Sequence, residues 1–185
     1  MYFVSNYWSE VKMARVSFTG YRPEKLPFRE GADERYLCFR KTLYKVIKRL
    51  AELGYTHFIS GIAMGFDTWV AEDVLTLKKE MPGVTLECAV PFPKQAEKWP
   101  REDRIRRSRI IEKSDSVIIT SNEYNSSAYF KRNRYMVDNS EVVVCCYDGK
   151  SGGTAYTVDY AKKKAKTVIQ INPTDMVVTV VAGKP

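Results

Sequence analysis

The chain has 185 residues, of which 44% are hydrophobic and 28% are charged, and these proportions fit one globular domain with a well-buried core. It has no apolar run near the roughly 20 residues that a membrane span needs, and its first residues lack the apolar stretch of a secretory signal. We therefore expect a cytoplasmic protein with no membrane partner. Its net charge of +8 favours an anionic partner, either a phosphate ligand, a nucleic acid or an acidic protein.

The cysteine and histidine content gives no support for a metal site. The four cysteines, Cys38, Cys88, Cys145 and Cys146, include no CxxC pair, and His57 is the only histidine. Structural zinc needs about four clustered Cys or His ligands. We predict no bound metal, and we interpret the cysteines of the apolar runs as small buried hydrophobic residues.

Turn residues and hydrophobic spacing divide the chain into alternating strands and helices. In chain order, the sequence predicts a strand at 15–19, a loop at 21–31, a helix from 33 to about 53, a strand at 57–60, a helix at 66–79, a strand at 84–90, a charged helix within 101–112, a strand at 116–120, a helix at 128–139, a strand at 141–147, a helix at 154–166 and a strand at 167–171. Gly54 ends the first long helix. Residues 176–182 predict either an added edge strand or a loose tail.

This alternation predicts an α/β protein with a Rossmann-like, predominantly parallel sheet and helices on both faces. The continuous apolar run at 142–146 fits a strand that is covered on both faces. We expect a peripheral N-terminal segment at 1–13, a Rossmann-like domain at 14–172 and a C-terminal tail at 173–185. Ligands of such folds sit at the carboxyl ends of the strands, near a topological switch point. The loops after the strands are therefore where binding residues are expected.

The loop after the second strand is a candidate anion site. It contains Ser60, Gly61, Gly65 and Asp67, and its glycines let the backbone turn tightly and approach a ligand. The helix that follows presents free N–H groups and the positive end of its dipole, while Asp67 could hold a ribose hydroxyl. The alternative is an ordinary Gly-rich connection with a capping aspartate. If the ligand site is here, Gly65→Val or Asp67→Ala abolishes binding without unfolding the chain.

A second Gly-rich loop precedes the last helix. It runs from Asp148 through Gly152, Gly153 and Thr154, and it predicts a second phosphate cradle. It is not a Walker A loop, because the GxxxxGK[ST] spacing is absent. Two such loops in one small sheet strengthen each other as evidence for a ligand site.

The remaining loops add single candidates. After the first strand come Thr19, Gly20, Tyr21 and Arg22, where Arg22 could clamp a phosphate and Tyr21 could stack on a base. Three residues that follow the third strand supply polar and aromatic surface or simply pack the loop: Pro91, Gln95 and Trp99. Two residues between the fourth and fifth strands are candidates for polar contacts: Asn133 and Asp138.

These motifs together resemble the SLOG superfamily, named after Smf/DprA and the LOG phosphoribohydrolases, and in particular its YpsA-like branch. The resemblance covers about residues 14–172. It is carried by Thr19-Gly-Tyr-Arg-Pro23, similar to TGHRP, by Ser60-Gly-x-Ala-x-Gly-x-Asp67, similar to SGxAxGxD, by Pro91, Gln95 and Trp99, similar to a P…Q…W segment, by Arg132-x-x-Tyr135-Met-Val-Asp138, and by Asp148-Gly-x-x-Gly-Gly-Thr154.

The resemblance implies a Rossmann-like fold and a nucleotide-type ligand similar to NAD or ADP-ribose. Its members differ in role: LOG enzymes hydrolyse the N-glycosidic bond of nucleoside monophosphates, DprA binds single-stranded DNA, and YpsA-like proteins are linked to cell division and stress in Gram-positive bacteria. Two departures stand out. Tyr21 replaces the usual histidine, and Thr157 stands where the LOG motif PGGxGTxxE has its catalytic glutamate. Asp159 would lie on a different helix face, so LOG-type hydrolysis is in doubt.

Three functions remain open from the sequence. The first is binding or sensing of a nucleotide or nucleotide-derived small ligand, with no catalytic residues assigned. The second is an N-glycosidase or phosphoribohydrolase, which needs a carboxylate near the glycosidic bond and an arginine such as Arg22 or Arg134 on the phosphate. The third is nucleic-acid binding, in particular of single-stranded DNA, suggested by the net charge and by the arginines within 101–112. A homo-oligomer is also possible.

Overall fold

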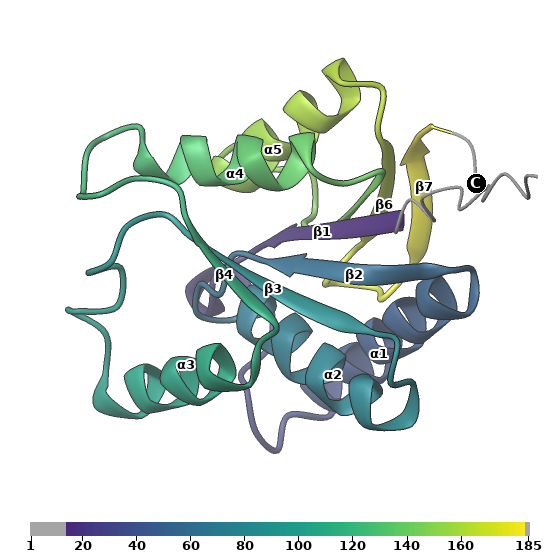
Figure 1. The fold of residues 1–185 in the computed structure, drawn as a ribbon. Coiled ribbons are helices and arrows are strands. Elements are labelled where there is room, and N and C mark those ends of the chain that lie inside the picture. Colours follow the sequence, from purple (N-terminus) through teal and green to yellow (C-terminus); the bar gives the residue numbers. More distant parts are fainter. Residues whose placement is uncertain (1–13, 184–185) are drawn as a thin grey trace, which may run out of the picture.

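The computed structural model describes residues 14–183, which form one twisted seven-stranded sheet between two layers of helices (Figure 1). The strands lie in the order β4-β3-β2-β1-β5-β6-β7. Their bounds are β1 Ala14–Gly20, β2 Tyr55–Ser60, β3 Thr85–Val90, β4 Ser116–Ile119, β5 Val142–Cys146, β6 Thr167–Ile171 and β7 Val178–Ala182. All neighbouring strands are parallel except β6 and β7, which are antiparallel. The predicted α/β, Rossmann-like class is confirmed.

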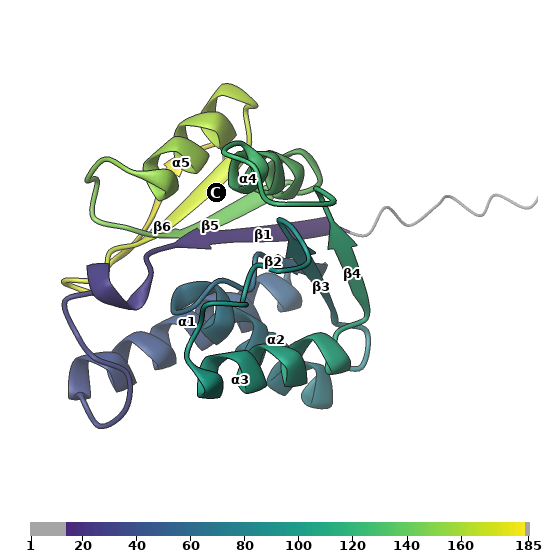
Figure 2. The ribbon, with the colours of Figure 1, turned by 90° about the vertical axis from the view of Figure 1, so that its left-hand side faces the viewer.

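The helices divide between the two faces of the sheet. Their bounds are α1 Glu34–Glu52, α2 Phe66–Glu80, α3 Arg101–Lys113, α4 Ala128–Asp138 and α5 Gly153–Lys163, with a short 3-10 helix, η1, at Pro23–Lys25. Figures 1 and 2 show α1, α2 and α3 on one face and α4 and α5 on the other. The sheet is therefore covered on both sides, as its apolar central strands require.

Each face of the sheet has its own hydrophobic core. The larger core includes Phe18, Leu43, Phe66 and Trp69, and the smaller one lies under α4 and α5. Adjacent residues of β5 alternate between the two, so that Cys146 packs in the larger core and Cys145 in the smaller. Both cysteines are fully buried. This explains why β5 reads as an unbroken apolar run.

Local signals set the ends of the helices. Asp33 caps α1, because its carboxylate accepts a hydrogen bond of 2.9 Å from the backbone N–H of Arg35. The chain leaves α1 through Gly54, whose φ of +92° is the left-handed region that glycine favours. The prediction for the last helix was three residues too long. It ends at Lys163, because Ala165 adopts a positive φ of 53° and turns the chain toward β6.

The topological switch point lies between β1 and β5. From β1 the chain builds outward through β2 and β3 to β4, and it then returns over α4 to place β5 against the other side of β1. The carboxyl ends of β1 and β5 consequently diverge into loops that belong to opposite helical layers. In open α/β sheets this crevice is the usual ligand site.

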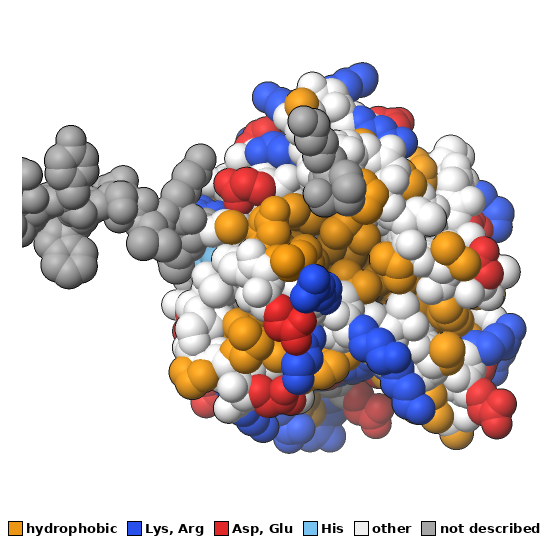
Figure 3. All heavy atoms as spheres, turned by 90° about the vertical axis from the view of Figure 1, so that its right-hand side faces the viewer, with side chains coloured by type: hydrophobic (Ala, Val, Ile, Leu, Met, Phe, Trp, Pro, Cys, Tyr) orange, Lys and Arg blue, Asp and Glu red, His pale blue; other side chains and the backbone are white. Residues whose placement is uncertain are grey.

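The end of the chain forms the edge strand β7, the first of the two alternatives predicted for residues 176–182. It pairs antiparallel with β6 and leaves several large hydrophobic side chains exposed near the end of α1. These side chains are Leu53, Val177, Val178, Val180 and Val181. Figure 3 shows hydrophobic side chains gathered on the side of the molecule where β7 lies.

Within residues 14–183, no helix is both long and apolar enough to cross a bilayer. The same residues contain no group of three or more His, Cys, Asp or Glu side chains placed to hold a metal ion. The predicted peripheral segment at 1–13 lies outside the described residues, and the proposed domain boundaries stay a prediction.

Candidate ligand-binding site

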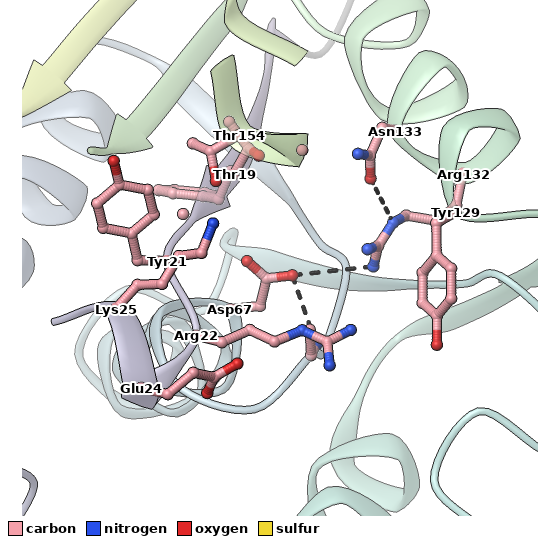
Figure 4. Close-up of a pocket in the computed structure, with 14 residues that line it drawn as sticks. Thr19, Tyr21, Arg22, Glu24, Lys25, Asp67, Tyr129, Arg132, Asn133 and Thr154 are labelled. Carbon is pink, nitrogen blue, oxygen red and sulfur yellow. Dashed lines mark hydrogen bonds and ion pairs between the residues drawn. The ribbon is translucent and has the colours of Figure 1, made fainter. Parts of the chain in front are cut away.

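A polar cavity of about 290 Å³ opens at the switch point. Loops after β1, β2 and β5 form it together with α4 (Figure 4). Its lining residues are Phe18, Thr19, Gly20, Tyr21, Arg22, Glu24, Lys25, Ala63, Asp67, Tyr129, Arg132, Asn133, Gly153 and Thr154. The cavity thus brings together eight of the sixteen residues that the sequence marked as ligand candidates: Thr19, Gly20, Tyr21, Arg22, Asp67, Asn133, Gly153 and Thr154.

A buried ion pair stands at the centre of the cavity. Arg132 reaches from α4 across the carboxyl ends of the strands, and its Nη1 lies 3.8 Å from Oδ2 of Asp67. The same Nη1 donates a hydrogen bond to the carbonyl oxygen of Gly61. Both side chains are less than a tenth exposed. Figure 4 shows the guanidinium of Arg132 pointing at the carboxylate of Asp67.

Burial shifts both partners of this pair toward their neutral forms. It raises the pKa of the Asp67 carboxyl, against the opposing effect of the Arg132 cation and of the Ala63 N–H, which donates to Oδ2 at 3.4 Å. It also lowers the pKa of Arg132, against the attraction of Asp67. The two groups therefore depend on each other to remain charged.

Gly61 is required for this pair to form. A Cβ at position 61 would lie 1.9 Å from Nη1 of Arg132 and 2.7 Å from Oδ2 of Asp67. Such distances are far inside van der Waals contact. The sequence predicted a close approach of the Gly61 backbone to a ligand, but what lies against it is the side chain of Arg132.

The rest of the β2–α2 loop holds Asp67 in place. The Ser60 hydroxyl donates to the backbone oxygen of Asp67 at 2.7 Å and accepts from the N–H of Ile62 at 3.1 Å. Gly65 adopts a φ of +85°, and a Cβ there would lie 2.8 Å from Cδ of Pro23. Ser60, Gly61 and Gly65 thus shape the site without lining the cavity.

The burial of Gly65 and Asp67 also bears on the variants that the sequence suggested. Val at position 65 would be strained and would collide with Pro23, and Ala at position 67 would leave Arg132 buried without its partner. Both changes will therefore destabilise the fold. Binding must be tested at residues that line the cavity and are not needed for packing.

The loop after β1 forms one wall of the cavity. Tyr21 is 5% exposed, and its hydroxyl donates a 2.5 Å hydrogen bond to Oδ1 of Asp148. Burial and this bond raise the pKa of Tyr21 to about 12, while Lys150 and Tyr21 together lower the pKa of Asp148 to about 2. Gly20 allows this loop to lie against α2, since a Cβ there would meet the ring of Phe66 at 2.3 Å.

Two cations in the cavity, Arg22 and Lys25, form no ion pair within 4 Å among residues 14–183, although the Arg22 cation acts at longer range to lower the pKa of Asp67. Arg22 lies over the ring of Tyr129, with its Cζ 5.8 Å from the ring centroid, and Lys25 lies over Tyr21 at the same distance. Lys25 also approaches the start of α5, because a Cβ on Gly152 would be 3.1 Å from its Nζ. Gly152 has a φ of +145° and is exposed just outside the cavity.

Helix α5 points its amino terminus at the cavity. Gly153 and Thr154 begin the helix and line the cavity, so its first N–H groups face the open space. No side chain caps this end of the helix. Unpaired N–H groups, the positive end of the helix dipole and Lys25 are therefore close together.

The position of the LOG glutamate is occupied by a structural threonine. The Thr157 hydroxyl donates to the Gly153 carbonyl oxygen and accepts from Nδ2 of Asn133, both at 2.9 Å. Oδ1 of Asn133 in turn accepts from Nε of Arg132 at 2.8 Å. Asn133 thus links Arg132 to α5. Asp159 is exposed and does not line the cavity.

Four other sequence candidates lie outside the cavity. Gln95 is buried in the segment between β3 and α3, where its Nε2 donates a weak hydrogen bond to the Gly61 carbonyl oxygen at 3.5 Å. Pro91 is buried in the loop after β3, and Trp99 is partly exposed before α3. Asp138 lies at the far end of α4, where it accepts from the Tyr160 hydroxyl at 3.0 Å.

The cavity also contains residues that the sequence did not single out as ligand candidates: Phe18, Glu24, Lys25, Ala63, Tyr129 and Arg132. For Arg132 a signal was present, because it begins the motif that ends at Asp138. Lys25 and Tyr129 carried no local signal. They belong to η1 and to the start of α4, and only the folded chain brings them to the switch point.

The fold and this cavity together define a doubly wound α/β protein with a polar site at its topological switch point. The chain belongs to the YspA SLOG family, whose YpsA sequence model matches residues 16–177. A UPF0398 protein of Bacillus cereus strain B4264 is 30% identical over 157 residues, which cover 83% of this chain and 85% of the relative. A UPF0398 protein of Bacillus thuringiensis strain Al Hakam has the same identity and coverage. The resemblance to the SLOG superfamily and its YpsA-like branch is confirmed.

Two solved structures share the fold. DNA processing protein A, DprA, from Streptococcus pneumoniae matches with a TM-score of 0.61 and 18% identity, over 86% of this chain and 50% of that one. DprA from Helicobacter pylori matches with a TM-score of 0.57 and 17% identity, over 85% of this chain and 65% of that one. The present chain therefore spans 50% of the S. pneumoniae DprA chain and 65% of the H. pylori one.

Proposed function

We propose that this protein binds a nucleotide or nucleotide-derived ligand in the cavity at the switch point. The observation that carries the proposal is the convergence of Arg22, Lys25 and the uncapped amino terminus of α5 on one cavity. Neither cation forms an ion pair within 4 Å among residues 14–183, although both line the cavity. A bound anion would supply the missing partner.

The physical match is to a phosphate group. Helix amino termini bind phosphates through free N–H groups and the helix dipole, and a nearby lysine adds a point charge. At α5 both contributions are present, with Gly152 leaving room beside Lys25. The net charge of +8 would raise the local concentration of anions further.

The cavity volume limits the part of the ligand that it encloses. At about 290 Å³ it lies at the lower end of the range for small-molecule pockets. A mononucleotide-sized group fits this space best. NAD or ADP-ribose would place one nucleotide unit inside and extend the other along the protein surface.

Lys25→Met tests the site directly. Because the Lys25 side chain is exposed and unpaired with acid, its loss should leave the melting temperature of the free protein unchanged. The affinity of the Lys25→Met variant for AMP, ADP-ribose or NAD, measured by isothermal titration calorimetry, should be about tenfold lower than that of the wild type. This corresponds to ~1.4 kcal/mol for a charge-assisted phosphate contact. The matched control is Lys41→Met on the exposed face of α1, which should bind as the wild type does. Equal affinity of K25M and K41M for every ligand would place the site elsewhere.

Nucleotide hydrolysis is a second candidate function. Two carboxylates line the cavity, Asp67 and Glu24, and the pKa of Asp67 is raised by burial. A raised pKa suits a general acid. Chromatography of each ligand after incubation decides between the two functions: intact ligand supports binding or sensing, and free base with a sugar phosphate shows an N-glycosidase.

Single-stranded DNA is a third candidate. The H. pylori DprA structure is described as showing a single-stranded DNA binding mode, and the net charge of the present chain is +8. The logarithm of the binding constant for an oligonucleotide would fall steeply and linearly with the logarithm of the salt concentration, with a slope set by the number of phosphates contacted. A single bound nucleotide would show a much shallower dependence. A cytoplasmic location and a link to stress or cell division remain predictions.

A further inference from the structure

Three aromatic rings gather on the α4 side of the cavity. Tyr129 lines the cavity, and the ring of Phe92 meets it edge-on with centroids 5.6 Å apart. The ring of Tyr124 meets Phe92 edge-on at 5.3 Å. These residues come from the start of α4, from the loop after β3 and from the loop after β4. The sheet topology therefore assembles one aromatic cluster from three separate segments.

Burial accounts for the position of Phe92, which is 6% exposed, but not for that of Tyr124. Tyr124 is 67% exposed, so it buries little apolar area, and burial is the main source of stability from an aromatic ring. Within residues 14–183, the hydroxyls of Tyr124 and Tyr129 form no hydrogen bond, whereas those of Tyr21 and Tyr135 donate to Asp148 and Glu87.

The cavity thus has two chemically different sides. Figure 4 shows Lys25 and Tyr21 on one side of Asp67 and Tyr129 on the other. The Lys25 side offers a cation and helix N–H groups, which suit phosphate. The Tyr129 side offers a ring and, 5.8 Å from its centroid, the planar guanidinium of Arg22. Aromatic rings and guanidinium planes are the groups on which nucleobases stack.

We propose that Tyr129, supported by Phe92 and Tyr124 and flanked by Arg22, is a base-stacking subsite. The ligand class is then a nucleotide with its base intact, and a sugar phosphate lacking the base would occupy only the Lys25 side. This inference rests on the proposed function, since it assigns the second half of the same ligand. It moves the stacking role that the sequence suggested for Tyr21 to a ring that the fold leaves more accessible.

The test compares AMP with ribose 5-phosphate, which is AMP without the base. Wild-type protein should bind AMP more tightly than ribose 5-phosphate. In Tyr129→Leu, which keeps the bulk of the side chain and removes the ring, AMP affinity should fall about tenfold, within the range measured for loss of one stacked base. Affinity for ribose 5-phosphate should not change. Tyr129→Phe should restore AMP binding, because the hydroxyl has no partner.

A neighbouring residue supplies the matched control. Phe130 follows Tyr129 on α4, is 42% exposed and packs against Tyr156 with centroids 4.7 Å apart, and it does not line the cavity. Phe130→Leu should bind both ligands as the wild type does. Tyr124→Leu, at the exposed end of the cluster, should weaken AMP binding less than Tyr129→Leu.

The outcomes separate the subsite from the proposed function. Wild-type binding of ribose 5-phosphate that K25M weakens supports the phosphate site whatever happens at Tyr129. Equal loss of both ligands in Tyr129→Leu, or no loss of AMP binding in Tyr129→Leu and Tyr129→Phe, would overturn the stacking subsite and leave the phosphate site in place. If wild-type protein binds neither compound, the proposed function fails and the subsite fails with it.

Discussion

Gly61 shows at the scale of one residue how the cavity constrains the sequence. A methyl group at this position would lie 1.9 Å from Arg132, so the arginine must move out of its buried site. We expect Gly61→Ala to lower the free energy of unfolding by about 1–3 kcal/mol, the usual cost of overpacking. Gly83→Ala is the control, because a Cβ there meets nothing within 4 Å. Chemical denaturation of both variants measures the difference, and equal stabilities would show that Arg132 moves without cost.

Arg132 is the second residue on which the cavity depends. Arg132→Leu leaves the Asp67 carboxylate buried without its cation, and breaking one partner of a buried pair typically costs 3–5 kcal/mol. Arg134→Leu removes an exposed arginine two residues away and should cost less than about 1 kcal/mol. Urea denaturation compares the two variants. Similar midpoints would mean that Asp67 becomes protonated or hydrated at little cost.

The sequence supported these residues unevenly. Gly61 was recognisable because a glycine between a strand and a helix indicates close approach. Arg132, 71 residues away, was marked as the start of a motif, but nothing in that motif identified it as the group that approaches Gly61. Asp67 was recognisable from its place in the first turn of a helix. Lys25 and Tyr129 were not, since an exposed lysine and a helical tyrosine have many ordinary uses. Contacts between distant segments are set by topology, which a local pattern does not encode.

At the scale of elements, an ionic cluster ties α1 to α2 and carries a pH dependence. Asp73 of α2 is buried and pairs with Arg40 of α1, and Arg40 also approaches Glu72 at 3.4 Å. Burial raises the pKa of Asp73 to about 6, against the opposing Arg40 cation. A folded-state pKa above the unfolded value means that the folded protein holds this proton more tightly. The contribution of Asp73 to stability is therefore full below about pH 4 and is lost as the pH rises through 6.

Asp73→Asn tests this linkage, because asparagine does not titrate. The difference in unfolding free energy between wild type and variant should shift against the wild type by on the order of 2–3 kcal/mol between pH 4 and pH 7. Glu102→Gln removes an exposed carboxylate on α3 and is the control, and the pH-dependent difference should be larger for D73N than for this variant. A difference for D73N no larger than that for the control would show that Asp73 ionises normally in the folded protein.

Most elements could be predicted because their buried residues recur at the short-range spacing of a strand or a helix. The central strand β5 is a continuous apolar run, since both of its faces are covered. The spacing of Leu43, Ile47 and Leu50, all of which are buried, predicts the helix α1. The strand β7 was ambiguous for a physical reason. Its valines stay largely exposed, so only its pairing with β6 makes it a strand. The end of α5 was misplaced because lysines at 164 and 166 favour helix, while the turn at Ala165 opposes it.

For the whole molecule, the β7 edge is where a homo-oligomer is best tested. Residues 177–182 contain no charge and no proline, the usual means by which edge strands avoid pairing with other chains. Val180 is 44% exposed and Val117, on the opposite edge strand β4, is 41% exposed. If a second copy of the chain pairs along β7, Val180→Lys should give a monomer by sedimentation velocity, while Val117→Lys should behave as the wild type. Identical behaviour of all three proteins would exclude this edge.

The reach of Arg132 over the end of the sheet has a consequence for dynamics. The two cores pack on opposite faces and share the strands, while Arg132 and the cavity are where side chains of α4 meet the loops that lead into α2. A ligand held between Lys25, α5 and Tyr129 would join the same two layers. Amide hydrogen exchange in α4 and α5 should then slow on binding together with that of α2, so that the layers open as one cooperative unit. Ligand binding would then be detected as slower, cooperative opening of both helical layers.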